Sequence, residues 1–420
     1  MNKKFRVKDF AIINAWGCNR GSEAMHSTIC SYLNQHCPDL DITIYARDWI
    51  DLSRFKNVQV KPMIKIQDLC PNDSKSQQKE LRNQYVRDPS LLSPLLDNIF
   101  NHDLVISSPE YPYLGDLFPE DEMESLLHLA LCKAKNIPFG ILANSAGPFN
   151  NPERKDIRLN LFKAALFWTV REDLSFNYVK NFVAGTQFPN HLGADVAFAH
   201  PNRSTTDFLP PWQSKDFYHA LEFIKSKPTI VVTLTDSDGY RRLDMTQELL
   251  KPSTYLPKLG KFLKHVVEKT GCQLIIFPHF YGKLEEQQII QTVIEESGIL
   301  SGIYVLNPLL NSEAHLYLYK AAEFAVTFRY HPLVFAARSS CPFMAVSYQY
   351  KFDGVLKFFE DPCPVVTPFD SLDSWMEAFA VCWDNREVTR QQIKNQLPSI
   401  VTSSRKHLDI LLNVIKQGSD

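Results

Sequence analysis

Short runs of apolar residues alternate along the chain with longer amphipathic segments. A short apolar run is typical of a strand buried on both faces of a sheet, and a longer amphipathic segment is typical of a helix that covers the sheet. The alternation therefore predicts an α/β protein with parallel sheets. The predicted strands lie at residues 9–15, 41–46, 58–63, 104–107, 139–144, 167–170, 229–235, 273–278, 303–306, 324–328 and 343–347.

The longer segments predict helices between these strands and after the last of them. They lie at residues 22–35, 122–135, 255–270, 283–297, 312–322, 333–338, 372–383 and 389–416. Two polar insertions, residues 68–89 and 110–124, show no apolar periodicity, and we expect them to be surface loops.

The pattern breaks once, at residues 199–215, where three prolines lie among Ser, Thr and Asn as in a linker. We therefore expect two doubly wound, Rossmann-like domains, residues 1–200 and 212–385, that face a central cleft. Residues 386–420 are predicted to form a helical tail that packs back on the first domain. Ligands of such sheets bind beyond the carboxyl ends of the strands, so the informative residues are those just after each strand.

The composition is that of an ordinary folded protein, with 420 residues of which 45% are hydrophobic and 22% charged. A formal net charge of −2 without a basic segment argues against a nucleic-acid partner. We find neither a signal-peptide pattern nor an apolar run near the ~20 residues of a membrane helix. Nine cysteines without a C-x-x-C pair argue against a disulfide framework or a zinc site. We expect a soluble cytoplasmic protein without a metal or a cofactor.

The first candidate binding residues follow the first predicted strand. Glycines let a backbone approach a ligand closely, and the N-terminus of the next helix offers free N–H groups to an anion. An ordinary strand-to-helix turn without a ligand explains the same glycines. The candidates here are Gly17, Asn19, Gly21, Ser22 and Glu23.

Three more candidates follow later strands of the first half. Ser145 lies in the small-residue segment 144–149 and can donate a hydrogen bond, although a turn forced by Gly-Pro explains that segment equally well. Arg171 closes an apolar strand and suits a carboxylate or a phosphate, while the two acidic residues after it can equally begin a helix. Asp195 is either a site carboxylate or a structural turn residue.

The most specific cluster lies in the second half. Arg329 and His331 follow one apolar strand and Lys351 follows the next. Arginine binds carboxylates and phosphates through its planar fork, and histidine exchanges protons near neutral pH. An isolated histidine is more often an interior residue, but a histidine between two cations on neighbouring strand ends favours a function. Tyr330 and His279, which also follows a strand, complete the candidate set.

Taken in order, these segments resemble the motifs of the polysaccharide pyruvyl transferase family. Residues 17–24 match the family's G-x-x-N-x-G-[DA]-E-A loop with one residue fewer between its first Gly and Asn. The family's G-P-F turn, V-R-E-x-x-S and D-x-A-F segments, and R-x-H followed by P and S-Y-x-x-K, recur later in the chain, so that the match spans about residues 10–355. The chain departs from the pattern at Ser22, where the family often has Asp or Ala, and at 107–110, where Ser-Ser-Pro-Glu replaces Gly-Gly. These departures bear on loop shape and acceptor specificity.

The resemblance implies a GT-B-like fold and an enzyme of polysaccharide or exopolysaccharide biosynthesis. It implies phosphoenolpyruvate as the donor substrate and, as the acceptor, a saccharide or lipid-linked saccharide on which a pyruvate ketal bridges two hydroxyls. Arg171, Arg329 and His331 are the family's donor-site residues, and we expect His331 to be the general acid or base.

Two alternatives stay open. One is a GT-B glycosyltransferase that uses a nucleotide sugar. Asp236 and Asp238 would then hold a divalent metal, although Asp before Gly in a turn is also favoured by local hydrogen bonds alone. The other is a non-catalytic, saccharide-binding member of the family.

Overall fold

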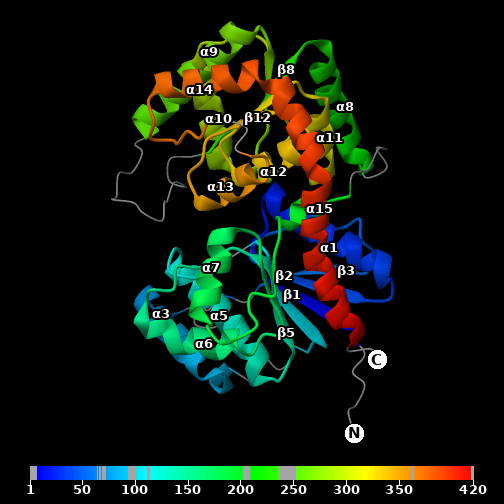
Figure 1. Cartoon of the computed structure of the whole chain (residues 1–420), viewed down its shortest axis with the longest axis vertical. Coiled ribbons are helices and arrows are strands. Elements are labelled where there is room, and N and C mark those ends of the chain that lie inside the picture. Colours follow the sequence, from blue (N-terminus) through cyan, green and yellow to red (C-terminus); the bar gives the residue numbers. More distant parts are fainter. Residues whose placement is uncertain are drawn as a thin grey trace. The chain divides into compact units, whose positions relative to one another are not determined.

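The computed structural model describes residues 7–63, 65, 68, 72–92, 101–110, 114–201, 209–235, 252–360 and 364–417. The chain divides into two compact units. Figure 1 shows its helices and strands, coloured by position in the sequence. Unit 1 comprises Met1–Cys18, Met25–Pro201 and Thr402–Asp420, and unit 2 comprises Asn19–Ala24 and Asn202–Val401. Neither unit is one continuous stretch of chain.

Unit 1 is built on a seven-stranded sheet in which every neighbouring pair is parallel. The strand order is β3-β2-β1-β4-β5-β6-β7. The inner strands are apolar and buried on both faces, as expected of a parallel sheet between two helix layers. The strands are β1 (Asp9–Ala15), β2 (Asp41–Ala46), β3 (Val58–Pro62), β4 (Leu104–Ser107), β5 (Phe139–Asn144), β6 (Trp168–Val170) and β7 (His191–Leu192).

Helices connect the strands of unit 1. They are α1 (Arg20–His36), α3 (Lys75–Arg87), η1 (Pro89–Leu92), α5 (Pro119–Ala134), η2 (Pro152–Arg154), α6 (Lys155–Phe162), α7 (Asp173–Phe182) and η3 (Val196–Ala199). The first turn of α1 belongs to unit 2 and the rest of that helix to unit 1.

Unit 2 repeats the same plan with five parallel strands in the order β10-β9-β8-β11-β12. Its strands are β8 (Thr229–Thr233), β9 (Gln273–Ile276), β10 (Ile303–Val305), β11 (Phe324–Thr327) and β12 (Phe343–Ala345). Its helices are α8 (Pro211–Ser226), α9 (Pro252–Thr270), α10 (Leu284–Ser297), α11 (Ser312–Ala321), α12 (Tyr330–Arg338), α13 (Tyr350–Lys357) and α14 (Leu372–Asp384). The last helix, α15 (Arg386–Gln417), contributes to both units.

The expectation of a loop over residues 68–89 is wrong, because α3 occupies most of that insertion. Ser74 and Gln77 form a reciprocal capping box at its start. The inward face of the helix carries the buried Arg82, which makes ion pairs with Glu120 and Glu124 of α5. A helix that buries a cation lacks the apolar stripe that the sequence analysis looked for.

Two other boundaries are corrected. The insertion 110–124 already contains the first turn of α5, which begins at Pro119 with Glu120, Asp121 and Glu122. The predicted linker 199–215 contains the start of α8, because Pro211 occupies its first turn, where a proline's missing N–H costs nothing. Among the described residues, no helix is long and apolar enough to cross a membrane.

Candidate functional site

The candidate residues fall into one cluster in each unit. The unit 2 cluster joins the first turn of α1 to the carboxyl ends of β8, β9 and β11. In a doubly wound sheet this edge is the ligand-binding edge, and β8 and β11 flank the point where the strand order reverses. The unit 1 cluster joins the ends of β5 and β6 to the start of η3.

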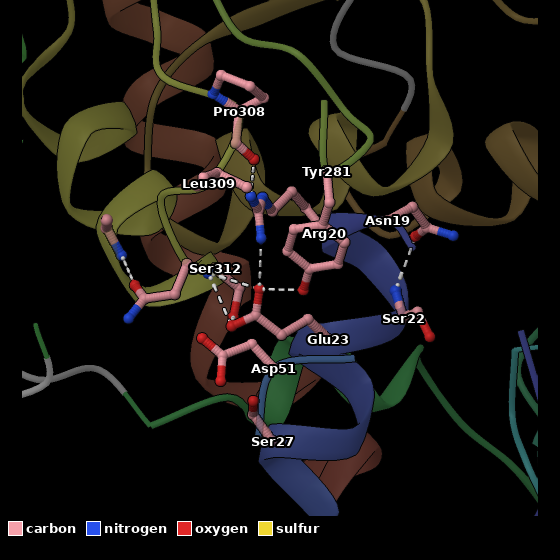
Figure 2. Close-up of polar contacts among 12 residues, drawn as sticks. Asn19, Arg20, Ser22, Glu23, Ser27, Asp51, Tyr281, Pro308, Leu309 and Ser312 are labelled. Carbon is pink, nitrogen blue, oxygen red and sulfur yellow. Dashed lines mark hydrogen bonds and ion pairs between the residues drawn. The ribbon is translucent and has the colours of Figure 1, made fainter. Parts of the chain in front are cut away.

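Glu23 is the centre of the hydrogen-bond network in the unit 2 cluster (Figure 2). Its carboxylate lies 3.0 Å from Nη1 of Arg20 and accepts a 2.7 Å hydrogen bond from the Tyr281 hydroxyl. It also accepts from the backbone N–H of Ser312 at 3.2 Å, at the N-terminus of α11, where the helix dipole favours an anion. Glu23 thereby fixes the first turn of α1 on unit 2.

Arg20 is buried, and its own contacts hold it rigidly. Its guanidinium lies over the Tyr281 ring at 3.7 Å from the centroid and donates to the Pro308 carbonyl. Its backbone N–H donates to the His279 carbonyl at 3.0 Å. Arg20 lies within the first motif but was not among the predicted site residues, because no spacing rule distinguishes a buried arginine from a surface one.

His331 packs directly on Gly21. A Cβ atom built on Gly21 would lie 2.0 Å from Nδ1 of His331, so only glycine fits this position of α1. On the other side, the His279 ring lies nearly parallel to the His331 ring, with 6.4 Å between the centroids and 13° between the planes. The structure thus brings together three predicted residues whose positions in the sequence are far apart.

Arg329 lies beside this histidine pair. Its Nε donates to the Leu234 carbonyl at 2.8 Å, just past β8, and its guanidinium lies over the Phe280 ring at 4.8 Å. Nη2 of Arg329 is 3.6 Å from the Glu286 carboxylate. That carboxylate also accepts the backbone N–H groups of His279 and Phe280, at 3.0 and 2.9 Å. Glu286 lies inside a helix rather than after a strand, and sequence reasoning missed it.

Two buried histidines of the cluster have depressed pKa values. Burial lowers the pKa of His279 well below its usual value, and nearby cationic groups, Arg329 first among them, lower it further. Burial and Arg20 likewise depress the pKa of His315. His279 and His315 are therefore neutral near pH 7, and burial is the main cause for both.

Tyr330 and Lys351 lie next to His331, at the edge of the cluster. The Tyr330 ring contacts the His331 ring edge-on at 5.1 Å, and Nζ of Lys351 lies over the Tyr330 ring at 5.0 Å. Lys351 lies in the first turn of α13, which begins at Tyr350. Of the loop before α1, Asn19 accepts the backbone N–H of Ser22 at 2.9 Å and so caps the helix (Figure 2).

The unit 1 cluster centres on Arg171, which is buried. Its guanidinium is 2.6 Å from Asp195 and 3.6 Å from Glu172, and its Nε donates to the Ser145 hydroxyl at 3.0 Å. Glu172 also accepts hydrogen bonds from Ser145, at 3.2 Å, and from Ser175. Arg171 therefore lies in a buried ion-pair network in which the carboxylates of Asp195 and Glu172 face its positive charge.

Gly17 also belongs to unit 1, and its backbone explains why it is glycine. Its φ is +85°, and a Cβ there would lie 2.2 Å from the Asp48 carbonyl oxygen. The close approach of two loops therefore accounts for Gly17 without a ligand. Asp236 and Asp238 lie outside the described residues, and within the described ranges no group of three His, Cys, Asp or Glu side chains is arranged to hold a metal ion.

Comparison with known proteins identifies one family. The family model for polysaccharide pyruvyl transferase matches residues 19–350. A search of curated proteins found no match.

Solved structures share the fold at low sequence identity. UDP-GlcNAc 2-epimerase from Neisseria meningitidis, bound to UDP-GlcNAc, is 14% identical with a TM-score of 0.62, over 96% of this chain and 100% of that one. MnaA of S. aureus, solved with UDP, is 13% identical with a TM-score of 0.58, over 97% and 96%. A glycosyltransferase from Rickettsia africae is 10% identical with a TM-score of 0.54, over 100% and 99%. These likenesses confirm the predicted GT-B-like fold.

Proposed function

The chain belongs to the polysaccharide pyruvyl transferase family, and on this basis we propose that it transfers a pyruvyl group from phosphoenolpyruvate to a saccharide. The product is a ketal in which one pyruvate carbon bridges two hydroxyls of the sugar. The observation that supports this donor best is the position of Arg329, which lies at the ligand-binding edge of the unit 2 sheet, just past β8, in the same cluster as the paired rings of His279 and His331. Phosphoenolpyruvate carries a carboxylate and a phosphate, the two groups that arginine binds through its planar fork.

The reaction needs one proton donor and one acceptor. Protonation of the methylene carbon makes the neighbouring carbon electrophilic, and a sugar hydroxyl forms a C–O bond to it. The bond to the phosphate oxygen then breaks, and a second hydroxyl closes the ketal. Of the two protons that the hydroxyls release, one balances the new methyl group and the other leaves with the phosphate.

Among the clustered histidines we assign the proton transfer to His331. Burial and the surrounding cations lower the pKa of His279 so far that it has no proton to give near neutral pH. His279 instead supports His331 from the parallel ring position, and Glu286 positions both His279 and Arg329. Arg329 stabilises the anionic donor and the departing phosphate. We retain Arg171 and Ser145 as donor-site residues because they match the family's motifs. Their contacts with Asp195 and Glu172 support a role in positioning.

The first test is binding of phosphoenolpyruvate to the purified chain by thermal shift and calorimetry. A ligand at 100 times its dissociation constant stabilises a protein by about 2.7 kcal/mol, which a thermal shift detects. We expect Arg329→Gln to abolish the shift, and Arg386→Gln, which removes an arginine from the start of α15, to leave it unchanged. A shift with nucleotide sugars and none with phosphoenolpyruvate would select the glycosyltransferase alternative.

The second test separates binding from turnover. His331→Ala should still bind phosphoenolpyruvate but lose phosphate release in the presence of a saccharide panel, by roughly 10²–10⁴-fold for the loss of a general acid or base. Unchanged phosphate release in this variant would refute the assignment of His331.

A further inference from the structure

Unit 1 contains a cavity that none of the proposed donor residues lines. Its volume is about 710 Å³, within the range of about 300–1,000 Å³ typical of small-molecule sites. Asn14 and Ala15 line it from the end of β1, and Arg47 and Met63 line it from just after β2 and β3. The cavity thus lies at the carboxyl edge of the sheet, where doubly wound domains bind ligands.

Helices α3 and α5 form the walls, and their acidic groups are already paired. Glu120 lies 3.0 Å from Nζ of Lys79 and also pairs with Arg82, which is 3.3 Å from Glu124. Burial acts to raise the pKa of Glu120, but hydrogen bonds and charges from Lys79 and Arg82 hold it below its usual value. Glu120 therefore stays ionised, and both carboxylates are matched by cations.

The third acidic residue of the lining is matched in the same way. Asp121 lies 3.2 Å from Nη1 of Arg47, which is itself stacked over the Trp16 ring at 4.5 Å. Five cationic and three acidic side chains line the cavity in all. Within the described part of the chain, neither Lys65 nor Lys75 makes an ion pair, so these two lysines carry the cationic excess.

Besides the charges, the lining presents hydrogen-bonding groups without charge. Ser76 and Gln78 of α3 and Ser125 of α5 belong to it, together with the Asn14 amide. Asn14 is fixed by hydrogen bonds to Ser107 at 3.2 Å and to His128 at 2.7 Å. Hydroxyls, amides and ionised carboxylates are the partners that the hydroxyl groups of a sugar require.

We infer that this cavity binds the acceptor, and that the acceptor is an anionic saccharide whose phosphate or carboxylate lies against Lys65 and Lys75. That the bound sugar is the acceptor rests on the proposed function, whereas the binding of an anionic sugar in this cavity does not. A charge-assisted contact to a lysine is about twice as strong as a neutral hydrogen bond, so the negative group should dominate affinity.

The test is calorimetric titration of the whole chain with defined probes. They are the 1-phosphates of glucose, galactose and mannose, glucuronate, methyl glucoside as a neutral sugar, and inorganic phosphate. We expect either the hexose phosphates or glucuronate to bind, which also tells the two sources of charge apart. The neutral sugar and inorganic phosphate should each bind at least roughly tenfold more weakly than the best anionic sugar. The neutral sugar lacks the negative group, and inorganic phosphate lacks the sugar hydroxyls.

Variants locate the binding. The double variant Lys65→Gln, Lys75→Gln should bind the anionic sugar roughly tenfold more weakly, or more weakly still. Ser76→Trp places a large ring in the first turn of α3 and should prevent binding in the cavity. The matched control is Lys56→Gln with Lys163→Gln, two exposed lysines of unit 1 outside the lining. Equal binding by both lysine pairs, or inorganic phosphate binding as tightly as the sugar phosphates, would overturn the inference.

Phosphoenolpyruvate is titrated into the same proteins. If it binds and no anionic sugar does, this inference is wrong and the proposed donor stands. If anionic sugars bind through Lys65 and Lys75 but phosphoenolpyruvate does not, the cavity assignment stands and the proposed function is wrong. Retained phosphoenolpyruvate binding in the lysine variants also shows that they are folded.

Discussion

Substitution of Gly21 by alanine tests the packing of the proposed catalytic histidine. Alanine in the first turn of a helix normally stabilises a protein relative to glycine, by about 0.5–1 kcal/mol. Here the added Cβ would lie 2.0 Å from Nδ1 of His331, whereas Cβ atoms are essentially never found closer than 3.0 Å to another heavy atom. The imidazole must therefore move by about 1 Å, and overpacking of this kind costs about 1–3 kcal/mol.

The expected result is a double loss. Gly21→Ala should lower the free energy of unfolding and should lower turnover roughly 10²-fold, because a displacement of about 1 Å at a catalytic group has that effect. Binding of phosphoenolpyruvate should change less than turnover, since Arg329 has no contact with Gly21 among those that the structure describes.

The control is the same substitution in a His331→Ala background, with urea unfolding as the assay. Without the imidazole the alanine has room, and Gly21→Ala should there stabilise the protein by about 0.5–1 kcal/mol. The change of sign between the two backgrounds is the signature of direct contact in a double-mutant cycle. Equal effects in both backgrounds would refute the packing argument.

The remaining predictions concern buried charge and pH. Glu23→Ala leaves the Arg20 guanidinium buried without its carboxylate, and we expect a loss of about 3–5 kcal/mol in urea unfolding. Glu23→Gln, which keeps acceptor atoms for Ser312, should cost less, and equal losses would contradict the ion-pair explanation. Burial, chiefly, lowers the pKa of His407 to about 3. Stability from this group is therefore complete above about pH 6.5 and falls as the pH drops toward 3, by up to about 1.4 kcal/mol per pH unit. His407→Gln should reduce the difference in unfolding free energy between pH 7.5 and pH 5, and an unchanged difference would contradict this account.

Much of the fold could be predicted because its strands are buried in parallel sheets. Four strands, β1, β2, β4 and β5, have the predicted boundaries, since a strand covered on both faces reads as a continuous apolar run. Helix α3 escaped prediction because its buried face carries Arg82, and α8 because Pro211 at its start reads as a loop signal. In both cases the helix is stabilised by residues far away in the sequence, so a local pattern does not reveal it.

The same distinction applies to the site. His279, Arg329 and His331 were selected because they follow strands, and the topology brings those strand ends to one edge of the unit 2 sheet. Gly21 was selected because it follows β1 of unit 1, and it belongs to the cluster because the first turn of α1 is part of unit 2. Glu286 was missed because its role depends on the turn of α10 that faces the His279 backbone. The φ of Gly17, +85°, and its close approach to Asp48 are a second reason for a glycine at that position, and they could not be predicted from the sequence.

The assignment of the first turn of α1 to unit 2 has a consequence for synthesis on the ribosome. Glu23 and its partner Ser312 are 289 residues apart in the chain. At about 5–20 residues per second, Glu23 is made roughly 15 to 60 s before Ser312 exists. During that interval the rest of α1 can pack in unit 1 while the carboxylate of Glu23 stays in water. Unit 2 therefore completes its hydrogen bonds only when residues 19–24, which are made first, bind to residues 202–401, which are made later. Residues 202–401 expressed alone would lack this first segment.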